Sequence, residues 1–344
     1  MPIAILAGIG WHTVGAACAA SFYAPIEKVR NWSWETTWAL MGFFSWILLP
    51  LTMSYIVLPN FYGFYASQPG SLLLKVALFG AMWGVGNVSY GLTMRHLGMS
   101  LGIGVAIGVT LVVGTLVPPL LHGEFVAKFS SRGGLWSMAG IVVALIGVAI
   151  VSYAGHQKEQ QLGAEVKEFN VTLGLALAVM CGIFSAGFSF GLDAATPLRD
   201  AALQAGLSPL FARLPCYGLI MGGGAIVNMT YCFTRLAFKK GISLRADLAQ
   251  SRATILKNVG LAAAGGVMWY LQFFFYSWGE ANIPARLDYV NWMLHMSIYV
   301  LCGGIVGLTL GEWAGVGKRP LRLLWAGILV IIAAANLVGL GMAS

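Results

Sequence analysis

The chain is short of charge. Asp, Glu, Lys and Arg make up only 9% of its 344 residues, whereas hydrophobic residues make up 58%. Soluble domains carry about 25% charged residues, so this chain has too few charges to cover a water-exposed surface. The composition therefore indicates a protein that crosses the lipid bilayer several times.

Cysteine-based sites are lacking as well. The five cysteines lie inside or at the edges of apolar runs, with no Cys-x-x-Cys pair and no histidine at metal-ligand spacing: Cys18, Cys181, Cys216, Cys232 and Cys302. An odd number of isolated thiols favours neither a disulfide framework nor a zinc site. We therefore expect no metal and no other cofactor.

Acidic residues are absent from the middle of every apolar run. Glu27, Asp193 and Glu280 stand at the ends of such runs, where we expect them to face solvent. A site for a lipophilic cation would need an acid deeper in the membrane. The net charge of +8 is best explained by basic cytoplasmic loops, so nucleic acid is not expected as a partner.

Apolar runs long enough to cross a hydrocarbon core of about 30 Å, which takes about 20 helical residues, recur along the chain. Lipid cannot satisfy exposed backbone groups, so each run must be a helix. The sequence therefore predicts an all-α membrane protein with ten transmembrane helices. We place them near 3–24, 36–58, 72–94, 98–121, 135–154, 171–192, 209–234, 256–279, 289–311 and 321–342.

The basic residues predict the orientation. Fourteen of the twenty Lys and Arg residues lie in the loops that follow odd-numbered spans, which places these loops in the cytoplasm and both termini in the periplasm. The first run contains Ala17-Cys18-Ala19, which imitates a leader cleavage site. No basic residue precedes that run, so we expect an uncleaved first span.

The two halves of the chain resemble each other. "GAMWGVGNVSYG" from Gly80 aligns with "GVMWYLQFFFYS" from Gly266, and "AASFYAPIE" ending at Glu27 aligns with "SAGFSFGLD" ending at Asp193. Five spans per copy is an odd number, so the second copy would enter the membrane from the opposite side. We expect two inverted five-helix repeats, at 1–155 and 171–344, joined by a cytoplasmic linker at 156–170, with a binding site where they meet.

Polar residues recur at helical spacing inside three spans. Side chains three or four residues apart share one helix face, and three such stripes occur: Asp288, Trp292, His295 and Tyr299; Trp83, Asn87 and Tyr90; Trp269, Gln272 and Tyr276. His12 lies near the middle of the first span. Because burying such groups in lipid is costly, we expect them to face a polar cavity.

A mixture of aromatic faces with amide and imidazole edges suits a sugar, which stacks one face and pairs its hydroxyls. The alternative is that single amides such as Asn87, Gln272 and Asn228 only bond neighbouring helices; Asn336, isolated in the last span, we assign to structure. For proton coupling the candidates are Asp288, His295 and His12. His295, two turns below Asp288, has the better case for a proton route, and His12 we assign mainly to substrate contact.

Several long motifs resemble a known family. The stretches "WSWETTW", "GAMWGVGNVSYGLTMRHLGMSLGIGVAIG", "MCGIFSAGFSF", "GGGAIVN" and "DYVNWMLHMSIYVLCGG" are similar to those of the bacterial L-rhamnose/proton symporters, within the drug/metabolite transporter superfamily. The resemblance covers essentially the whole chain. It implies an inner-membrane protein that imports L-rhamnose with protons, and related sugars such as L-lyxose or L-mannose.

The resemblance also suggests the sugar site. By position it places the following side chains around the sugar: His12, Trp83, Asn87, Tyr90, Trp269, Gln272, Trp292 and His295, with Asp288 at the outer mouth. The implied partners are L-rhamnose, protons and the lipid bilayer. No obligate protein partner is evident from the sequence.

Two other functions compete with this prediction. One is an exporter of drugs or metabolites on the same ten-helix fold, which the missing midmembrane acid disfavours for cationic substrates. The other is a membrane enzyme or scaffold. An enzyme would need a nucleophile with its base, or metal ligands, and the loops are too short to hold them.

Overall fold

The computed structural model describes residues 3–97, 99–163, 170–285, 290–311 and 313–343, and within these residues every regular element is a helix. The elements are α1 (Ile3–Ser21), α2 (Tyr23–Ile26), α3 (Trp34–Gly42), the π-helix η1 (Phe43–Leu48), α4 (Leu49–Val57), α5 (Phe61–Ala66), α6 (Gly70–Leu97), α7 (Met99–Leu121), α8 (Phe125–Phe129), α9 (Arg132–Gln161), α10 (Val171–Ser185), α11 (Gly187–Ala194), α12 (Thr196–Gln204), α13 (Leu214–Phe238), α14 (Leu244–Leu248), α15 (Arg252–Ala281), α16 (Asn291–Thr309) and α17 (Lys318–Ala343).

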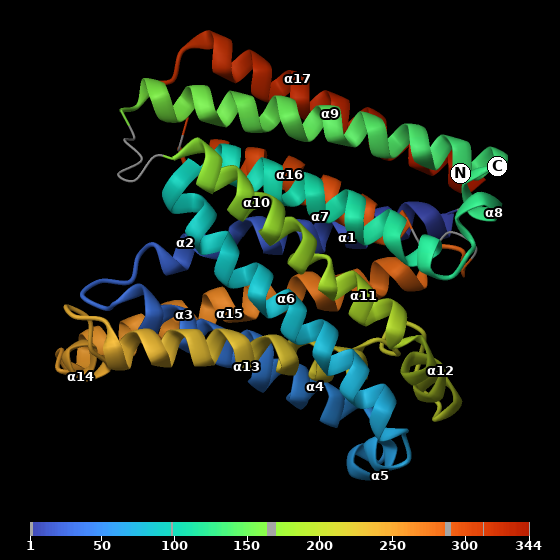
Figure 1. Cartoon of the computed structure of the whole chain (residues 1–344), viewed down its shortest axis with the longest axis horizontal. Coiled ribbons are helices and arrows are strands. Elements are labelled where there is room, and N and C mark those ends of the chain that lie inside the picture. The colour runs from blue at the N-terminus through green and yellow to red at the C-terminus, as the bar shows by residue number, and fades with distance from the viewer. Residues whose placement is uncertain (1–2, 98, 164–169, 286–289, 312, 344) are drawn as a thin grey trace.

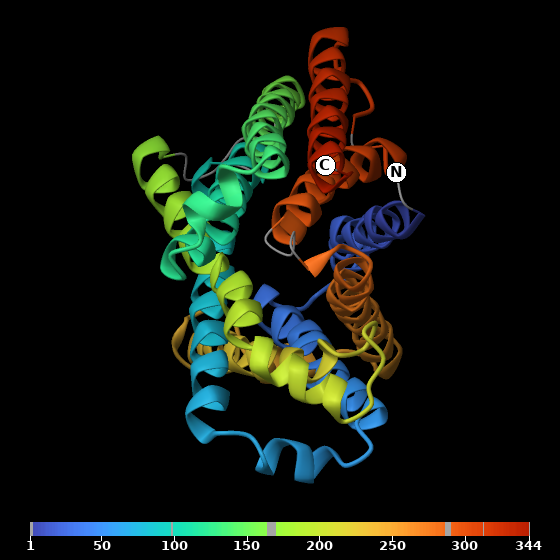
Figure 2. The ribbon, with the colours of Figure 1, turned by 90° about the vertical axis from the view of Figure 1, so that its right-hand side faces the viewer.

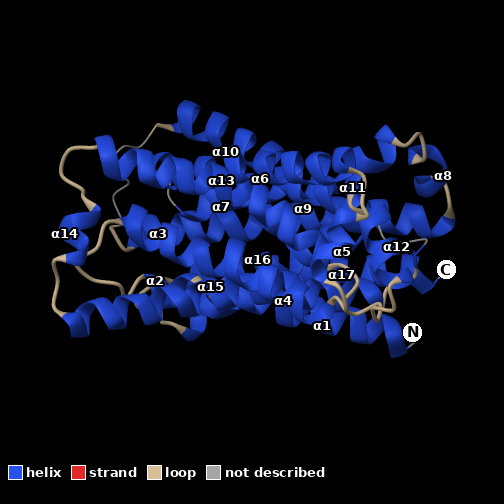
Figure 3. Ribbon diagram, turned by 90° about the horizontal axis from the view of Figure 1, so that it is seen from below, coloured by secondary structure: helices blue, strands red, loops and turns tan. Residues whose placement is uncertain are grey.

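Most of the expected spans are confirmed as apolar helices. In the described chain, nine segments have the length and apolar composition to cross a membrane: Ile3–Ile26, Trp34–Val57, Gly70–Tyr90, Arg132–Gln161, Thr172–Gln204, Leu214–Phe238, Arg252–Ala281, Asn291–Thr309 and Lys318–Val338. The remaining expected span, 98–121, falls on α7, where the apolar part Val105–Leu121 is shorter than a full membrane span. The long helices run along one common direction, with both termini at the same end of the molecule (Figure 1, Figure 3).

Helices from the two halves of the chain are interleaved. α9 packs along α17 on one side of the molecule, and α13 packs on α3 and α4 on the opposite side (Figure 2). Between these pairs, α6 packs against α7, α10 and α13, whereas α1 packs against α15 and α16. The centre of the bundle is thus built from both halves.

The helical segment Trp34–Val57 changes its pitch in the middle. The π-helix η1 occupies Phe43–Leu48, and Pro50 follows at the start of α4. Proline has no N–H to donate to the preceding turn, which explains a wider turn just before it. The Trp46 side chain lies against Gly42 in this segment and is fully buried.

Glycine permits the close approach of α6 and α13. A Cβ on Gly223 would overlap the backbone carbonyl of Ala77, and a Cβ on Gly84 would lie 2.8 Å from the carbonyl oxygen of Gly224. Small residues let helix backbones approach closely in membranes, where dispersion contacts replace the hydrophobic effect between helices. These glycines are therefore required by packing rather than by a special backbone conformation.

We predict opposite effects for alanine at two neighbouring glycines of α13. Gly223→Ala forces α6 and α13 apart and should destabilise the protein by about 1–3 kcal/mol. Gly222→Ala should be neutral or stabilising by about 0.5–1 kcal/mol, because alanine favours helix and a Cβ there meets nothing within 4 Å. Thermal unfolding of both variants in detergent checks this, and equal midpoints would contradict the packing role of Gly223.

Candidate functional site

A cavity of about 540 Å³ lies within the bundle. Its wall comes from α1, α2, α3, α6, α7, α9, α13, α16 and α17, and it extends to the end of the molecule where α13 and α16 end, at the left of Figure 1. Sites for small molecules are concave spaces of about 300–1,000 Å³ with a few placed polar groups. The cavity thus has the size of a small-molecule site.

Polar side chains of α6 and α16 line the cavity: Asn87, Tyr90 and Tyr299. The side chains of Tyr90 and Tyr299 lie close to each other in this wall. The amide nitrogen of Asn87 is buried and has no hydrogen-bond partner. Leaving a buried donor unpaired costs about 1–3 kcal/mol, which a bound hydroxyl group or water would recover.

Aromatic side chains of α3 cover another part of the wall. Trp34 and Trp38 both line the cavity, and their rings stack with centroids 4.9 Å apart. The Trp38 indole N–H donates to Oδ1 of Asn228 over 3.2 Å, and the Asn228 amide donates to the carbonyls of Gly84 and Gly224. Asn228 therefore joins α3, α6 and α13 and holds Trp38 in the cavity wall.

Charged residues surround the end of the cavity near the molecular surface: Glu27, Glu35, Lys158, Arg235 and Lys239. Nε of Arg235 lies 3.3 Å from Oε1 of Glu35, and the Lys158 ammonium lies 5.1 Å from the centroid of Trp313. Both signs of charge are present here, and the Arg235 side chain is about one third exposed. This end of the cavity is therefore more polar and more accessible to solvent than the deep wall.

An aromatic layer, defined as Trp83, Phe188, Phe273 and Trp292, separates the cavity from the rest of the bundle centre. Phe188 stacks on Phe273 with centroids 4.1 Å apart and lies nearly parallel to Trp292 at 5.9 Å. The Trp83 ring packs edge-on against Phe188 at 5.3 Å. All four are buried and none lines the cavity. Trp83 lies one turn before Asn87 on α6, so the layer stands at the deep end of the cavity.

Beyond the aromatic layer lies a histidine cluster, defined as His12, Tyr276, Asn291 and His295. Nδ1 of His12 lies 3.4 Å from Nδ1 of His295, and Nε2 of His12 lies 3.1 Å from Oδ1 of Asn291. The Tyr276 ring packs edge-on against both imidazoles, at 5.1 and 5.3 Å between centroids. Both histidines are fully buried. Gly279 makes room for them, since a Cβ there would lie 2.7 Å from the His12 ring.

Several buried polar atoms near this cluster have no hydrogen-bond partner. They are Nε2 of His295, Nδ2 of Asn291, Nε2 of Gln272 and Nε1 of Trp269. Gln272 and Trp269 follow Tyr276 back along α15 at successive turns. Unpaired donors and acceptors at bilayer depth are costly, so this row of atoms marks a path suited to water, protons or a polar ligand.

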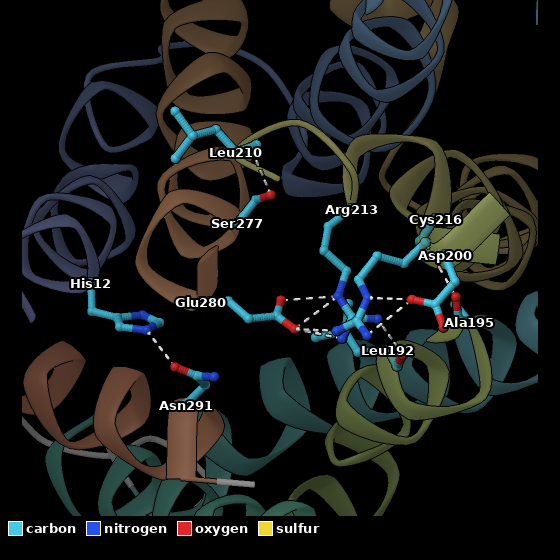
Figure 4. A network of polar contacts seen from close by, with 11 residues as sticks. His12, Leu192, Ala195, Asp200, Leu210, Arg213, Cys216, Ser277, Glu280 and Asn291 are labelled. Carbon is cyan, nitrogen blue, oxygen red and sulfur yellow. Dashed lines mark hydrogen bonds and ion pairs between the residues drawn. The ribbon is translucent and has the colours of Figure 1, made fainter. Parts of the chain in front are cut away.

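An ion pair closes the end of the bundle opposite the charged end of the cavity. Nε of Arg213 donates to both carboxylate oxygens of Glu280, at 2.9 and 3.0 Å, and Nη1 donates to the carbonyl of Leu192 (Figure 4). Burial acts to lower the pKa of Arg213, but the charge of Glu280 and its hydrogen bonds outweigh this and hold the pKa above its ordinary value. The guanidinium group therefore stays charged. Arg199 approaches the same carboxylate at 3.6 Å.

Comparison with known proteins identifies the family. The family model for L-rhamnose-proton symport proteins matches residues 1–344. The chain belongs to this family. It is 61% identical over 339 residues to the L-rhamnose-proton symporter of Pectobacterium atrosepticum, covering 98% of each chain, and 57% identical over 344 residues to that of Escherichia coli, covering all of each chain.

Membership of the rhamnose-proton symport family decides between the competing functions. The family consists of transporters, so the expectation that the chain is not an enzyme is confirmed, and the exporter alternative receives no support from these relatives. The apolar helices agree with a multi-pass membrane transporter. Among the described residues, no group of three or more His, Cys, Asp or Glu side chains could hold a metal ion.

The side chains expected around the sugar lie inside the bundle, buried or half-buried, but they fall into separate groups. Asn87 and Tyr90 line the cavity. Trp83 and Trp292 belong to the aromatic layer, and the Trp292 indole N–H donates to the carbonyl of Thr110. The polar stripe of α6 is thus divided: Trp83 belongs to the aromatic layer, whereas Asn87 and Tyr90 line the cavity.

The remaining expected residues lie on the far side of the aromatic layer or beside it. His12 and His295 come together in the histidine cluster, although they are distant in the sequence. Trp269 packs against Phe22, which lines the cavity, and Gln272 is buried. Asp288 lies outside the described residues.

The sequence reading was wrong about Glu280 and overlooked Asn291. Glu280 was expected to face solvent, but its side chain is only 8% exposed because Arg213 pairs with it. Glu27 and Asp193 are exposed, as expected. Asn291 stands one turn before His295 on the same helix, so its spacing was the available signal that it could reach the same space.

We predict that the ion pair behaves as a unit. Arg213→Gln leaves a buried carboxylate without its partner and should destabilise the protein by about 3–5 kcal/mol, whereas the double variant Arg213→Gln with Glu280→Gln should lose much less. Arg199→Gln is the control with a small expected loss, because Arg199 is further from Glu280 and more exposed. Chemical unfolding in detergent measures all four proteins. Equal losses in the single and double variants would show that the pair is not coupled.

Proposed function

We propose that the protein is a symporter that imports L-rhamnose together with protons across the inner membrane of a bacterium by alternating access. The observation that carries the proposal is the cavity of about 540 Å³ lined by Asn87, Tyr90 and Trp38 inside a bundle of apolar helices, in a chain of the L-rhamnose-proton symport family. L-lyxose and L-mannose are further candidate substrates. No obligate protein partner and no cofactor are required.

We also propose that ten membrane helices form two inverted repeats of five, with halves at 1–155 and 171–344. Equivalent positions of the two halves are separated in the sequence by 186 residues for Trp83 and Trp269, and by 166 residues for Phe22 and Phe188. Equivalent ring pairs occur in both: Trp83 with Phe188 at 5.3 Å and Trp269 with Phe22 at 4.8 Å. These matched contacts support the repeat.

The pairing of helices supports the same symmetry. α1 packs on α15 and α16, and α10 packs on α6 and α7. In each case the first helix of one half packs on the third and fourth helices of the other. The segment 156–170 would then be the linker, although α9 continues as a helix to Gln161.

The distribution of positive charge supports an orientation with both termini in the periplasm. The charged end of the cavity carries Lys158, Arg235 and Lys239 and lies away from the termini (Figure 1). Basic residues favour the cytoplasmic side. The cavity would then face the cytoplasm, with the Arg213–Glu280 pair closing the periplasmic side.

For the sugar we propose a site at the deep end of the cavity. Asn87, Tyr90 and Tyr299 would pair with hydroxyl groups, while the buried Trp38 ring would pack against the apolar face and the methyl group of a 6-deoxy sugar. Trp83, Trp269, Gln272 and Trp292 stand behind this wall and would contact the sugar when the aromatic layer opens.

For the proton we propose the histidine cluster. His12 and His295 are fully buried titratable groups in contact with each other, on the periplasmic side of the aromatic layer in the proposed orientation. An imidazole changes charge near physiological pH, which suits a proton carrier. Asp288, which precedes the cluster on the chain, remains our candidate for the outer end of the proton route.

The function is tested with purified protein in liposomes. Addition of L-rhamnose outside the vesicles should acidify the lumen, as reported by an internal dye, and an inward proton gradient should drive accumulation of the sugar. In detergent, L-rhamnose at one hundred times its Kd should stabilise the protein by about 2.7 kcal/mol. Sugar entry without proton movement would make the protein a facilitator.

We predict that Asn87→Leu weakens binding of L-rhamnose by about 3- to 10-fold, the loss expected for one neutral hydrogen bond. Asn336→Leu is the matched control, since Asn336 is exposed and its amide bonds only to Ile332 of its own helix. Calorimetric titration of both variants measures the Kd. Unchanged affinity in Asn87→Leu would remove this residue from the sugar site.

We predict that His295→Ala and Asp288→Asn each abolish accumulation of L-rhamnose against its gradient but retain exchange of labelled for unlabelled sugar. The reason is that loss of the proton carrier uncouples the sugar from the proton gradient. His122→Gln is the control, because His122 is half-exposed and paired with Asp193. Normal accumulation in both variants would move the proton site to His12 or elsewhere.

A further inference from the structure

The histidine cluster contains a directed chain of hydrogen bonds. Oδ1 of Asn291 faces Nε2 of His12 at 3.1 Å, and Nδ1 of His12 faces Nδ1 of His295 at 3.4 Å. The chain ends at Nε2 of His295, which is buried and has no partner. All three side chains are at most 1% exposed, so bulk water does not compete for these bonds.

The carboxamide oxygen at one end sets the position of every hydrogen in the chain. An amide oxygen only accepts, so with Oδ1 of Asn291 facing His12, as in the structure, Nε2 of His12 carries the hydrogen. In a neutral imidazole the other nitrogen is then bare, so Nδ1 of His12 accepts and Nδ1 of His295 donates. Nε2 of His295 is consequently left bare, with a lone pair directed into the buried space.

An added proton therefore has one place to go. It forms an N–H bond at Nε2 of His295, and the donor is a hydronium ion that becomes water. The positive ring keeps donating from Nδ1 to His12, so the chain of hydrogen bonds is unbroken. A second proton at Nδ1 of His12 would set two N–H groups against each other over 3.4 Å, so the pair accepts one proton at a time.

We propose that Asn291 is a positioning residue that fixes the tautomers of His12 and His295, so that the transported proton is taken up and released at Nε2 of His295. This inference rests on the proposed function of a proton symporter. Asn291 would act through His12 and need not touch the sugar.

Few charged or titratable groups surround the pair. On α16 itself, Tyr299 follows His295 by one turn. From α15, Tyr276 packs against both rings, and the Glu280 carboxylate acts electrostatically on His12 while bound to Arg213. Among the described side chains of α7, none is titratable, and the basic residues of α17 lie in its first two turns, at the opposite end of the bundle. Substitution of Asn291 should therefore cause a measurable change in the proton affinity of the imidazole pair.

Two variants of Asn291 should shift the pH dependence of proton-driven uptake in opposite directions. Asn291→Leu removes the acceptor for Nε2–H of His12, which is more strongly needed when the pair is positive, so the alkaline limb should move to lower pH by about 0.4–1.1 units. Asn291→Asp retains an acceptor and adds negative charge, so the limb should move to higher pH. Sugar exchange at saturating L-rhamnose should persist in both.

The matched controls are Asn282→Leu and Asn282→Asp. Asn282 caps α15 at the same end of the bundle, and its amide bonds only to the carbonyl of Trp278. These substitutions change the same groups without touching the imidazole pair, so both controls should keep the pH profile of the parent. A shift of equal size in Asn282→Asp would attribute the effect to added charge alone and overturn the role of Asn291.

A second measurement needs no transport and no folded variant of Asn291. In protein labelled with ¹⁵N-histidine, with resonances assigned from His12→Gln and His295→Gln, the neutral state should show bare nitrogens at Nδ1 of His12 and Nε2 of His295. A proton on Nε2 of neutral His295 would overturn the proposal. Absence of rhamnose-driven proton movement in the parent protein would instead overturn the proposed function, and the tautomers would still decide the role of Asn291.

Discussion

Polar side chains at bilayer depth must be enclosed by helices, because lipid offers them no partners. This constraint explains why the backbones of α6 and α13 approach until a Cβ on Gly223 has no space. It also explains why both halves of the chain contribute to the centre, since one half alone would leave the polar faces of α6 or α15 against lipid. The cavity and the histidine cluster depend on this enclosure.

The aromatic layer divides the enclosed space into two compartments of different character. On one side Asn87 and the tyrosine pair line a cavity that continues to a charged surface. On the other side the imidazoles of His12 and His295 are sealed from solvent. In the proposed mechanism the sugar and the proton therefore lie on opposite sides of Phe188 and Phe273. A rearrangement of these rings that joins the compartments would let the charge on the imidazoles influence the sugar site, which is the physical requirement for coupling.

Hydropathy was sufficient to predict the nine membrane-length helices of the described chain, because each span must be apolar and about 20 residues long whatever its neighbours are. Spacing along a helix was sufficient to predict that Trp83, Asn87 and Tyr90 face inward. Contacts between distant spans were beyond such reasoning. No residue near Glu280 in the sequence indicates that it pairs with Arg213, 67 residues earlier, so the burial of Glu280 could not be predicted. The same holds for the approach of His12 to His295, 283 residues apart.

Assigning a role to an inward-facing amide requires its hydrogen-bond partners as well as its position on the helix face. Asn228 is buried and Asn87 half-buried. The Asn228 amide accepts from Trp38 and donates to two carbonyls, whereas the Asn87 amide nitrogen is buried and has no partner. From the sequence alone, each of these amides could equally bind a ligand or bond neighbouring helices. The hydrogen-bond partners distinguish a residue that joins helices from one that can bind a ligand.

The two ends of the bundle differ in how strongly they are held. At the charged end of the cavity, Arg235 and Glu35 lie 3.3 Å apart with the guanidinium partly in solvent, so separating them replaces the pair by water. At the other end, Arg213 and Glu280 are buried and doubly hydrogen-bonded, and their separation would strand both charges unless water enters. Opening toward the proposed periplasmic side thus requires hydration of Glu280, close to the histidine cluster. Water that reaches Glu280 also comes near His12, so the step that opens this end would bring the proton pathway into contact with solvent.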